Sequence, residues 1–383
     1  MECQGGHFPP HDPNFVRLLP TGTSWVQIAE AGFNNPQNIA IQNLALFTNS
    51  AGENYYFLSA LNPTTGAQLW QRRLAGNSGL RPSWGLIIKD GFGNPANAGI
   101  AHLLQFKGQL YAGTTSNEKN GGEVWRTANG IQWDQVVSAG FGDPTNAEIV
   151  RFIEFDSQLY ASTRSLSNRH GGEIWRSDTG DAGDWERVVA DGLGDSNNQS
   201  VSALVVFNKA LFVGTSNPAT GPQVWRSANG VDWTPVSLDG FGAGNQAGHG
   251  VTAVAVYADQ LYVATDGVPD SPYGVEVWRC QVCEGDDWTR VVENGFGNAE
   301  MSGTAALVVH KEQLYLVAGN NASGLEMWRT TNGVEWEAVS EGGIDNPNNV
   351  GVFSGNSVVS MKGRLLVGTW NEVEGGQLWV YLP

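Results

Sequence analysis

Short apolar stretches alternate with turns rich in glycine, asparagine and proline along almost the whole chain. In the clearest example, residues 100–106 are followed by a Lys-Gly turn, by a second strand-like stretch at 109–114 and by a third at 123–127. An Asn-Gly pair then leads into residues 133–137. Apolar stretches this short, separated by tight turns, predict four antiparallel β-strands rather than helices.

The same four-strand unit recurs about every fifty residues, and two tryptophans mark each copy. The third strands carry Trp70, Trp125, Trp175, Trp225, Trp278, Trp328 and Trp379. The fourth strands carry Trp25, Trp84, Trp133, Trp185, Trp233, Trp288 and Trp336. One tryptophan, Trp370, has no equivalent in the other copies. Repeats of this kind are typical of propellers, so we expect an all-β, seven-bladed β-propeller with four antiparallel strands per blade.

The two ends of the chain supply complementary parts of one blade. The last copy stops after its third strand, whereas residues 25–28 form a fourth strand that no other three precede. Pairing these segments would close the last blade with the N-terminal strand and remove an open sheet edge. We therefore expect residues 1–23 to form an N-terminal tail and residues 24–383 to form a single domain.

The turn between the third and fourth strands repeats a Ser/Thr-x-Asn-Gly-x-x-Trp pattern. The pattern stands at 127–133, 227–233 and 330–336, and a variant of it runs from Ser177 to Trp185. This turn resembles the Asp-box hairpin of sialidase-type (BNR) repeats, although it is one residue shorter and usually has Asn in place of Asp. The resemblance implies a folding element at the periphery of the blades, away from any active site.

Charge and composition narrow the range of partners. The chain has 21 basic and 38 acidic residues, a formal charge of −17. This field repels nucleic-acid phosphates and anionic lipids, so neither partner is expected. The sequence has no run of eighteen apolar residues, so no membrane span is expected, and its start shows no secretory signal.

The cysteines bear on the compartment. Cys280 and Cys283 form a Cys-x-x-Cys pair within a β-turn, without the two further soft ligands that zinc would need. We expect a local disulfide, with free thiols as the alternative; a disulfide would indicate an extracellular or cell-surface location. Cys3 is either a lipid-anchor cysteine or a stray terminal thiol. No cofactor is expected; Ca²⁺ binding is the alternative, although the Asp-x-Asp-x-Asp-Gly spacing typical of Ca²⁺ loops is absent.

Breaks in the repeat are a better guide to a ligand site than its recurring polar residues. The asparagines that end the loop before each innermost strand recur in five blades, which indicates that they close their own turns. In contrast, the loop before the innermost strand is longer in blades five and seven than in their siblings. Trp370 directly follows the second strand of blade seven, where the other blades have no tryptophan.

We expect the ligand site on the face where these loops emerge, beside blade six. Its candidate ligand-binding residues are Trp370, Asn371, Glu372, Phe353, His249, Asp266 and Tyr273. Aromatic rings next to carboxylates and amides suit sugars, because the C–H faces of a sugar stack while its hydroxyls are hydrogen-bonded. The alternative is that Trp370 plugs the central channel or packs under a loop.

A second candidate cluster lies on blades two and three. It consists of His102, Glu148, Arg151 and Arg164. Two basic groups and a histidine suit carboxylate binding or acid–base catalysis, although single polar residues on strands are more often structural. A sialidase would need three arginines converging on one carboxylate. Since the non-periodic arginines near this face come from one blade, sialidase activity is not expected.

These observations predict a secreted or surface protein that binds carbohydrate in a lectin-like manner through the loop face of blades five to seven. The first alternative is a glycan hydrolase or lyase on the same face, with paired acids such as Asp266 and Glu372. The second alternative is a protein-interaction scaffold without a small ligand. Saturable glycan binding, turnover of a glycan, or capture of a protein partner would distinguish the three.

Overall fold

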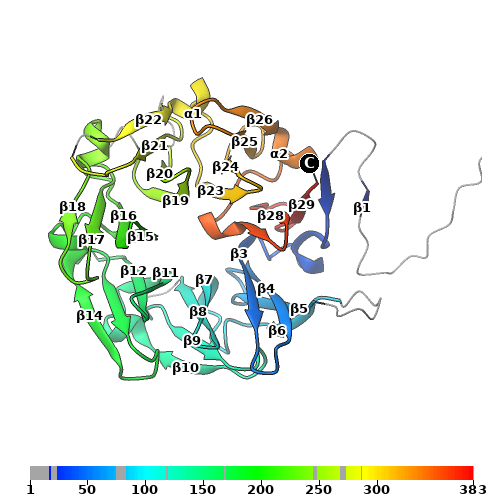
Figure 1. Ribbon diagram of the computed structural model, residues 1–383. Helices are drawn as coiled ribbons and strands as arrows, with labels where there is room; N and C mark the ends of the chain where they lie inside the picture. Colours follow the sequence, from blue (N-terminus) through cyan, green and yellow to red (C-terminus); the bar gives the residue numbers. More distant parts are fainter. Residues whose placement is uncertain are drawn as a thin grey trace, which may run out of the picture.

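The computed structural model describes residues 17–18, 24–74, 83–117, 120–167, 170–244, 248–267, 273–285 and 287–382. Within these ranges the chain is all-β, and its helices are single turns. Units of antiparallel strands stand around a central axis, and units that are consecutive in the sequence are neighbours in space (Figure 1). Single paired positions link the three units from β7 to β18 into one twelve-stranded sheet. This is a propeller-type arrangement.

Within the described residues, six blades consist of four consecutive antiparallel strands. Blade one is β3 (Ala40–Thr48), β4 (Asn54–Leu61), β5 (Gln68–Arg73) and β6 (Gly85–Ile88). Blade two is β7 (Asn97–Phe106), β8 (Gln109–Ser116), β9 (Val124–Thr127) and β10 (Asp134–Val137). Blade three is β11 (Asn146–Phe155), β12 (Gln158–Ser165), β13 (Ile174–Ser177) and β14 (Trp185–Val189). Blade four is β15 (Ser200–Phe207), β16 (Ala210–Ser216), β17 (Val224–Ser227) and β18 (Thr234–Pro235). Blade five is β19 (Val251–Tyr257), β20 (Gln260–Thr265), β21 (Val277–Cys280) and β22 (Thr289–Val292). Blade six is β23 (Ala305–His310), β24 (Gln313–Ala318), β25 (Glu326–Thr330) and β26 (Glu337–Ser340).

A further sheet joins the two ends of the chain. It contains β27 (Val358–Met361), β28 (Arg364–Gly368) and β29 (Leu378–Tyr381), and we call it blade seven. Strand β2 (Trp25–Gln27) pairs antiparallel with β29, so that Trp25 lies opposite Tyr381. Most of the expected tail 1–23 lies outside the described residues; its Arg17–Leu18 forms β1, which pairs with β2.

One-turn helices precede most of the innermost strands. They are η1 (Ala31–Asn34), η2 (Ala139–Gly142), η3 (Asp191–Gly194), η4 (Asp239–Gly242), α1 (Asn294–Gly297) and α2 (Gly342–Asp345). In η2, Gly140 and Phe141 both have positive φ, and the Phe141 ring stacks on Trp175 of blade three at 4.5 Å. The same ring meets Trp185 edge-on at 5.4 Å. One phenylalanine therefore packs against both tryptophans of a blade, which explains why they recur as a pair.

The loop asparagines close their own turns, as the repeat predicted. The Asn146 amide donates to the carbonyl of Gly140 at 3.0 Å and to Glu173 Oε2 at 2.8 Å. Asn38 likewise donates to Gly32 O and to Gln68 Oε1. These buried amides satisfy the backbone of the tight turn and link it to the third strand.

Neighbouring blades are joined through the turns between third and fourth strands. The Tyr111 hydroxyl of blade two donates to the carbonyl of Thr179 in blade three at 3.1 Å. In the next position Gly180 has a φ of 74°, and a Cβ there would overlap the Tyr111 hydroxyl. Glycine is therefore required for both its conformation and its lack of a side chain. In blade five this turn instead contains a buried Cys280–Cys283 disulfide.

The innermost strand of blade seven is short. Strand β27 starts at Val358, and Gly355–Ser357 forms the one-turn helix η6. The Ser354 and Ser357 hydroxyls both donate to the carbonyl of Gln42 in blade one, at 3.0 and 3.1 Å. The extra residues of blade seven thus reach toward the axis of the ring, where Gly355 approaches Thr252 and Ala253 of blade five.

Candidate functional site

Trp370 lies between blades seven and one. Its backbone forms isolated bridges with Ala40 and Gly351, and its ring lies 5.6 Å from the ring of Phe353. Both rings are half-buried against Ala40, Leu61 and Ala98, which form a small apolar cluster on blades one and two. The structure therefore brings Phe353 and Trp370 together as an aromatic pair with a shared apolar base.

The two residues after Trp370 differ in their exposure. Glu372 is exposed, and its Oε1 accepts a hydrogen bond from Trp370 Nε1 at 3.1 Å. Asn371 is fully buried; its Oδ1 accepts from the backbone N–H groups of Val373 and Glu374, and its amide donates to Asn349. The polar atoms of Asn371 thus hold the turn, whereas Glu372 presents a carboxylate beside the indole.

The other expected ligand residues lie on blade five. Asp266 Oδ1 accepts from the backbone N–H groups of His249 and Gly250, both at 2.8 Å. Burial raises the pKa of Asp266, and these two backbone donors oppose the shift. Tyr273 lies in the loop that follows, near Gly267. Phe353 and Trp370, in contrast, pack their rings on the apolar cluster of blades one and two.

The second expected cluster is more compact. Glu148 and Arg164 lie opposite each other on β11 and β12 and form an ion pair at 2.9 Å. Arg151 donates to the carbonyl of Val150 at 2.9 Å, and His102 Nδ1 accepts from the backbone N–H of Phe152 at 2.7 Å. The electrostatic influence of Glu148 on Arg151, and of Arg151 on His102, places all four groups in one neighbourhood.

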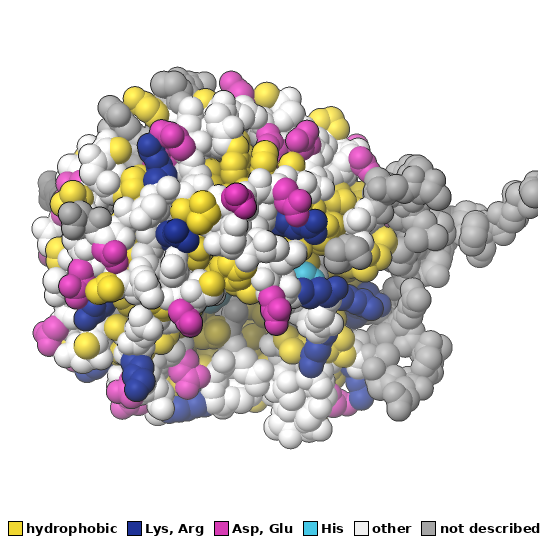
Figure 2. All heavy atoms as spheres, turned by 45° about the horizontal axis from the view of Figure 1, so that its top comes forward, with side chains coloured by type: hydrophobic (Ala, Val, Ile, Leu, Met, Phe, Trp, Pro, Cys, Tyr) yellow, Lys and Arg dark blue, Asp and Glu magenta, His cyan; other side chains and the backbone are white. Residues whose placement is uncertain are grey.

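Two of these residues line a cavity at the centre of the ring. Its volume is about 510 Å³, and His102, Arg151, Thr252, Asn356 and Ser360 contribute polar groups to its wall. The amide nitrogen of Asn356 is buried without a hydrogen-bond partner among the described residues. Figure 2 shows a hollow near the middle of the face turned to the viewer, with acidic and basic side chains interspersed around it.

The charges of the residues that line this cavity favour binding of an anion over acid–base catalysis. Burial, reinforced by the nearby Arg151 charge, lowers the pKa of His102 to about 3, so its imidazole is neutral at pH 7. Because Nδ1 accepts a hydrogen bond, the neutral ring carries its proton on Nε2. Burial also lowers the pKa of Arg151 to about 10, which leaves the guanidinium charged. A histidine with this pKa is a poor general acid at neutral pH.

Among the described residues, no group of three or more His, Cys, Asp or Glu side chains is arranged to hold a metal ion. None of the helices in the described ranges has the length and apolar content needed to cross a bilayer.

Sequence reasoning missed several residues that line hollows. Asn356 lies in the lengthened segment of blade seven, so the unequal loop length was a usable signal for it. Tyr56, Arg72 and Arg364 line a larger cleft between blades one and seven. Each departs from the residue common to the other blades, but that signal appears only when the strands are aligned by their pairing.

Comparisons with known proteins return low similarity. No family model matches the sequence, and no curated protein matches it. A GH74 xyloglucanase from Xanthomonas campestris is 17% identical over 82% of this chain and 46% of its own, with a TM-score of 0.48. A Trypanosoma rangeli sialidase is 12% identical over 93% of this chain and 55% of its own, with a TM-score of 0.44. The N-terminal domain of Nup159 is 12% identical over 93% of each chain, with a TM-score of 0.48. The chain spans about half the length of the first two proteins, and similarity this low transfers no function from any of the three.

Proposed function

We propose that this chain is a seven-bladed β-propeller, closed by strand β2, that binds carbohydrate through the face bearing Trp370 and Phe353. The turns between third and fourth strands are its degenerate Asp-box hairpins. The proposal rests chiefly on one observation: the half-buried Phe353–Trp370 pair, with ring centroids 5.6 Å apart and no counterpart in the other blades.

The surroundings of this pair suit a sugar ring. The apolar base of Ala40, Leu61 and Ala98 supports the rings from below. The hydrogen bond from Trp370 Nε1 to Glu372 fixes the indole and keeps a carboxylate at its edge. A rigid aromatic surface with an acceptor beside it is the arrangement that binds the C–H face and the hydroxyls of a pyranose.

The geometry favours binding over hydrolysis. A glycan hydrolase or lyase would use Asp266 and Glu372 on one sugar. The Asp266 carboxylate, however, accepts from two backbone N–H groups of the loop before β19, and Glu372 accepts from Trp370. The disulfide in blade five supports an extracellular or cell-surface location for the binding protein.

The test is a glycan array followed by titration of the best ligand with three proteins. Trp370→Ala should weaken binding about tenfold or more, because stacking on a desolvated ring contributes about 1–3 kcal/mol. Val373→Ala, an exposed change in the same turn, is the matched control and should bind like the wild type. Unchanged affinity of a folded Trp370→Ala protein would contradict the proposal, and product formation would favour the hydrolase instead.

A further inference from the structure

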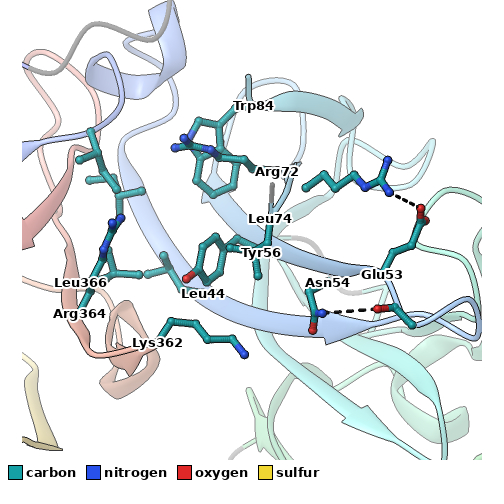
Figure 3. A pocket seen from close by; sticks show the side chains of 14 residues that line it. Leu44, Glu53, Asn54, Tyr56, Arg72, Leu74, Trp84, Lys362, Arg364 and Leu366 are labelled. Atoms are coloured by element: carbon teal, nitrogen blue, oxygen red, sulfur yellow. Dashed lines mark hydrogen bonds and ion pairs between the residues drawn. The ribbon is translucent and has the colours of Figure 1, made fainter. Parts of the chain in front are cut away.

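A cleft lies between blades one and seven, at the ends of the strands remote from Trp370. Its volume is about 620 Å³. Buried Leu44, Leu366 and Leu378 contribute to its lining, together with the half-buried rings of Tyr56 and Trp84. Figure 3 shows Tyr56, Arg72 and Trp84 on one side of the cleft and Arg364 and Leu366 on the other. Strand β28 starts at Arg364 and ends just before Thr369 and Trp370, so the cleft and the aromatic pair occupy opposite faces of the ring.

The cleft exists because one aromatic side chain is missing. In each of the other blades, one residue of the second strand lies opposite the tryptophan of the third strand. The residue just before it in the sequence is aromatic. These residues are Phe57, Tyr111, Tyr160, Phe212, Tyr262 and Tyr315. Four of them fill the space beneath the glycine turn of the next blade, next to Gly130, Gly180, Gly230 and Gly333. Blade seven has Leu366 at this position, and the smaller side chain leaves a cleft between the described residues of blades seven and one.

Two more departures from the repeat face the same cleft. The position equivalent to Tyr56 is occupied by a fully buried leucine in the other blades, for example Leu110 and Leu159. Arg364 begins the second strand of blade seven, where four other blades start with glutamine: Gln109, Gln158, Gln260 and Gln313. Packing does not require these changes, since the other blades close without them. Their convergence on one cleft indicates a function specific to this junction.

The rim of the cleft is cationic in a chain whose formal charge is −17. Arg72, Arg73, Lys362 and Arg364 line it, and Glu53 is its one acidic residue among the described lining residues. Glu53 is paired with Arg73 at 2.6 Å. Lys362 and Arg364 are exposed and have no ion-pair partner in the described part of the chain. Burial raises the pKa of the Tyr56 hydroxyl, and the charges of Arg364 and Arg72 oppose that shift, so both arginines lie near this hydroxyl.

We propose that this cleft binds a small ring-bearing organic anion. Its carboxylate, sulfate or phosphate meets Lys362 and Arg364, assisted by Arg72, while its ring lies on the apolar floor between Tyr56 and Trp84. The site is separate from the aromatic pair and does not depend on the function proposed for it. Lys362 and Arg364 have no ion-pair partner among the described residues, so they can attract the charge of such a ligand without the cost of breaking an existing ion pair, beside an apolar hollow with aromatic walls.

Calorimetric titration with three probes tests the proposal and distinguishes two sources of the anion. The probes are trigalacturonic acid, adenosine monophosphate and the neutral sugar maltotriose. We expect saturable binding of at least one anion, weakened by added salt, and no comparable binding of maltotriose. The anion that binds identifies the source as a carboxylated sugar or a nucleotide. Absence of binding by both anions, or equal binding of maltotriose, overturns the proposal.

Variants locate the binding in this cleft. Lys362→Gln combined with Arg364→Gln should weaken anion binding roughly tenfold or more, and Arg364→Gln introduces the residue that four sibling blades already carry. Leu366→Phe, which restores the aromatic found in the other blades, should fill the cleft and also abolish binding. Lys311→Gln is the matched control: Lys311 occupies the same turn in blade six, with a φ of 47° against 48° for Lys362. Anion binding that survives both the charge variant and Leu366→Phe would overturn the assignment, whereas Trp370→Ala should leave it unchanged.

Discussion

Trp25 lies opposite Tyr381 in the pair formed by β2 and β29, and the centroids of the two rings are 4.9 Å apart. The two residues come from opposite ends of the chain, yet both are almost fully buried in one apolar cluster with residues of blades six and seven. The backbone continues the pairing, because Ile28 N donates to Leu378 O at 2.9 Å and Leu382 N donates to Ser24 O. The two termini therefore depend on each other for burial.

Removing the Trp25 ring should weaken this junction. We expect Trp25→Ala to lower the free energy of unfolding by about 3–5 kcal/mol, as for other buried aromatic residues cut to alanine. Urea denaturation followed by tryptophan fluorescence measures the change, with Leu382→Ala as a control because Leu382 is 52% exposed. Equal stability of the two variants would show that β2 contributes little to the fold.

Reduction of the disulfide should have a small effect on stability. Cys280 and Cys283 are separated by only three positions, so the bond closes a very short loop and restricts the unfolded chain little. Treatment with a phosphine reductant should lower the free energy of unfolding, measured by urea denaturation, by less than about 2 kcal/mol. Thiol titration of nonreduced, denatured protein should detect Cys3 and neither of the other two; three free thiols would contradict the bond.

Trp370→Ala should separate a ligand role from a packing role. Because the ring is only half-buried, we expect a stability loss well below the roughly 3–5 kcal/mol of a core tryptophan, together with the loss of glycan binding. Thermal unfolding and glycan titration on the same preparation measure both quantities. A large fall in stability would identify Trp370 as a packing residue of the junction between blades seven and one.

Stability should fall on acidification because of His102. Its pKa is about 3 in the folded protein and near 6.5 when unfolded, so the unfolded chain takes up a proton first. The contribution of His102 to the free energy of unfolding is therefore most favourable above pH 6.5, where the imidazole is neutral in both states. The free energy of unfolding then decreases as the pH falls from about 6.5 toward 3, by as much as a few kcal/mol. Urea midpoints measured across this range should show the slope.

His102→Asn should flatten that dependence, since the asparagine Oδ1 can accept the Phe152 N–H without titrating. His170→Asn serves as the control, because His170 is largely exposed and pairs with Asp191 at the surface. If His102→Asn retains the full acid dependence, the loss must come from other groups, such as His310, whose pKa burial also lowers.

The sequence alone determined the β-strand units, their order and the pairing partners within each. Strand pairing depends on the local apolar pattern and on turns such as Asn129-Gly130, and both can be recognised directly in the sequence. The same pattern predicted the pairing of residues 25–28 with 377–381, because an orphan strand and an incomplete sheet satisfy each other's open edges. It also predicted that loop asparagines such as Asn146 serve their own turns.

Tertiary structure alone decided which unusual residues meet. The expected site was read as one group, but Trp370 and Phe353 pack on blades one and two while His249 and Asp266 bind each other on blade five. The cleft at Leu366 could not be predicted from the sequence before the strands were aligned by their pairing. The loss of an aromatic side chain there leaves the strand intact and changes only the space beside the next blade. Local patterning sets pairing within a sheet, whereas contacts between sheets depend on side-chain volumes from residues far apart in the chain.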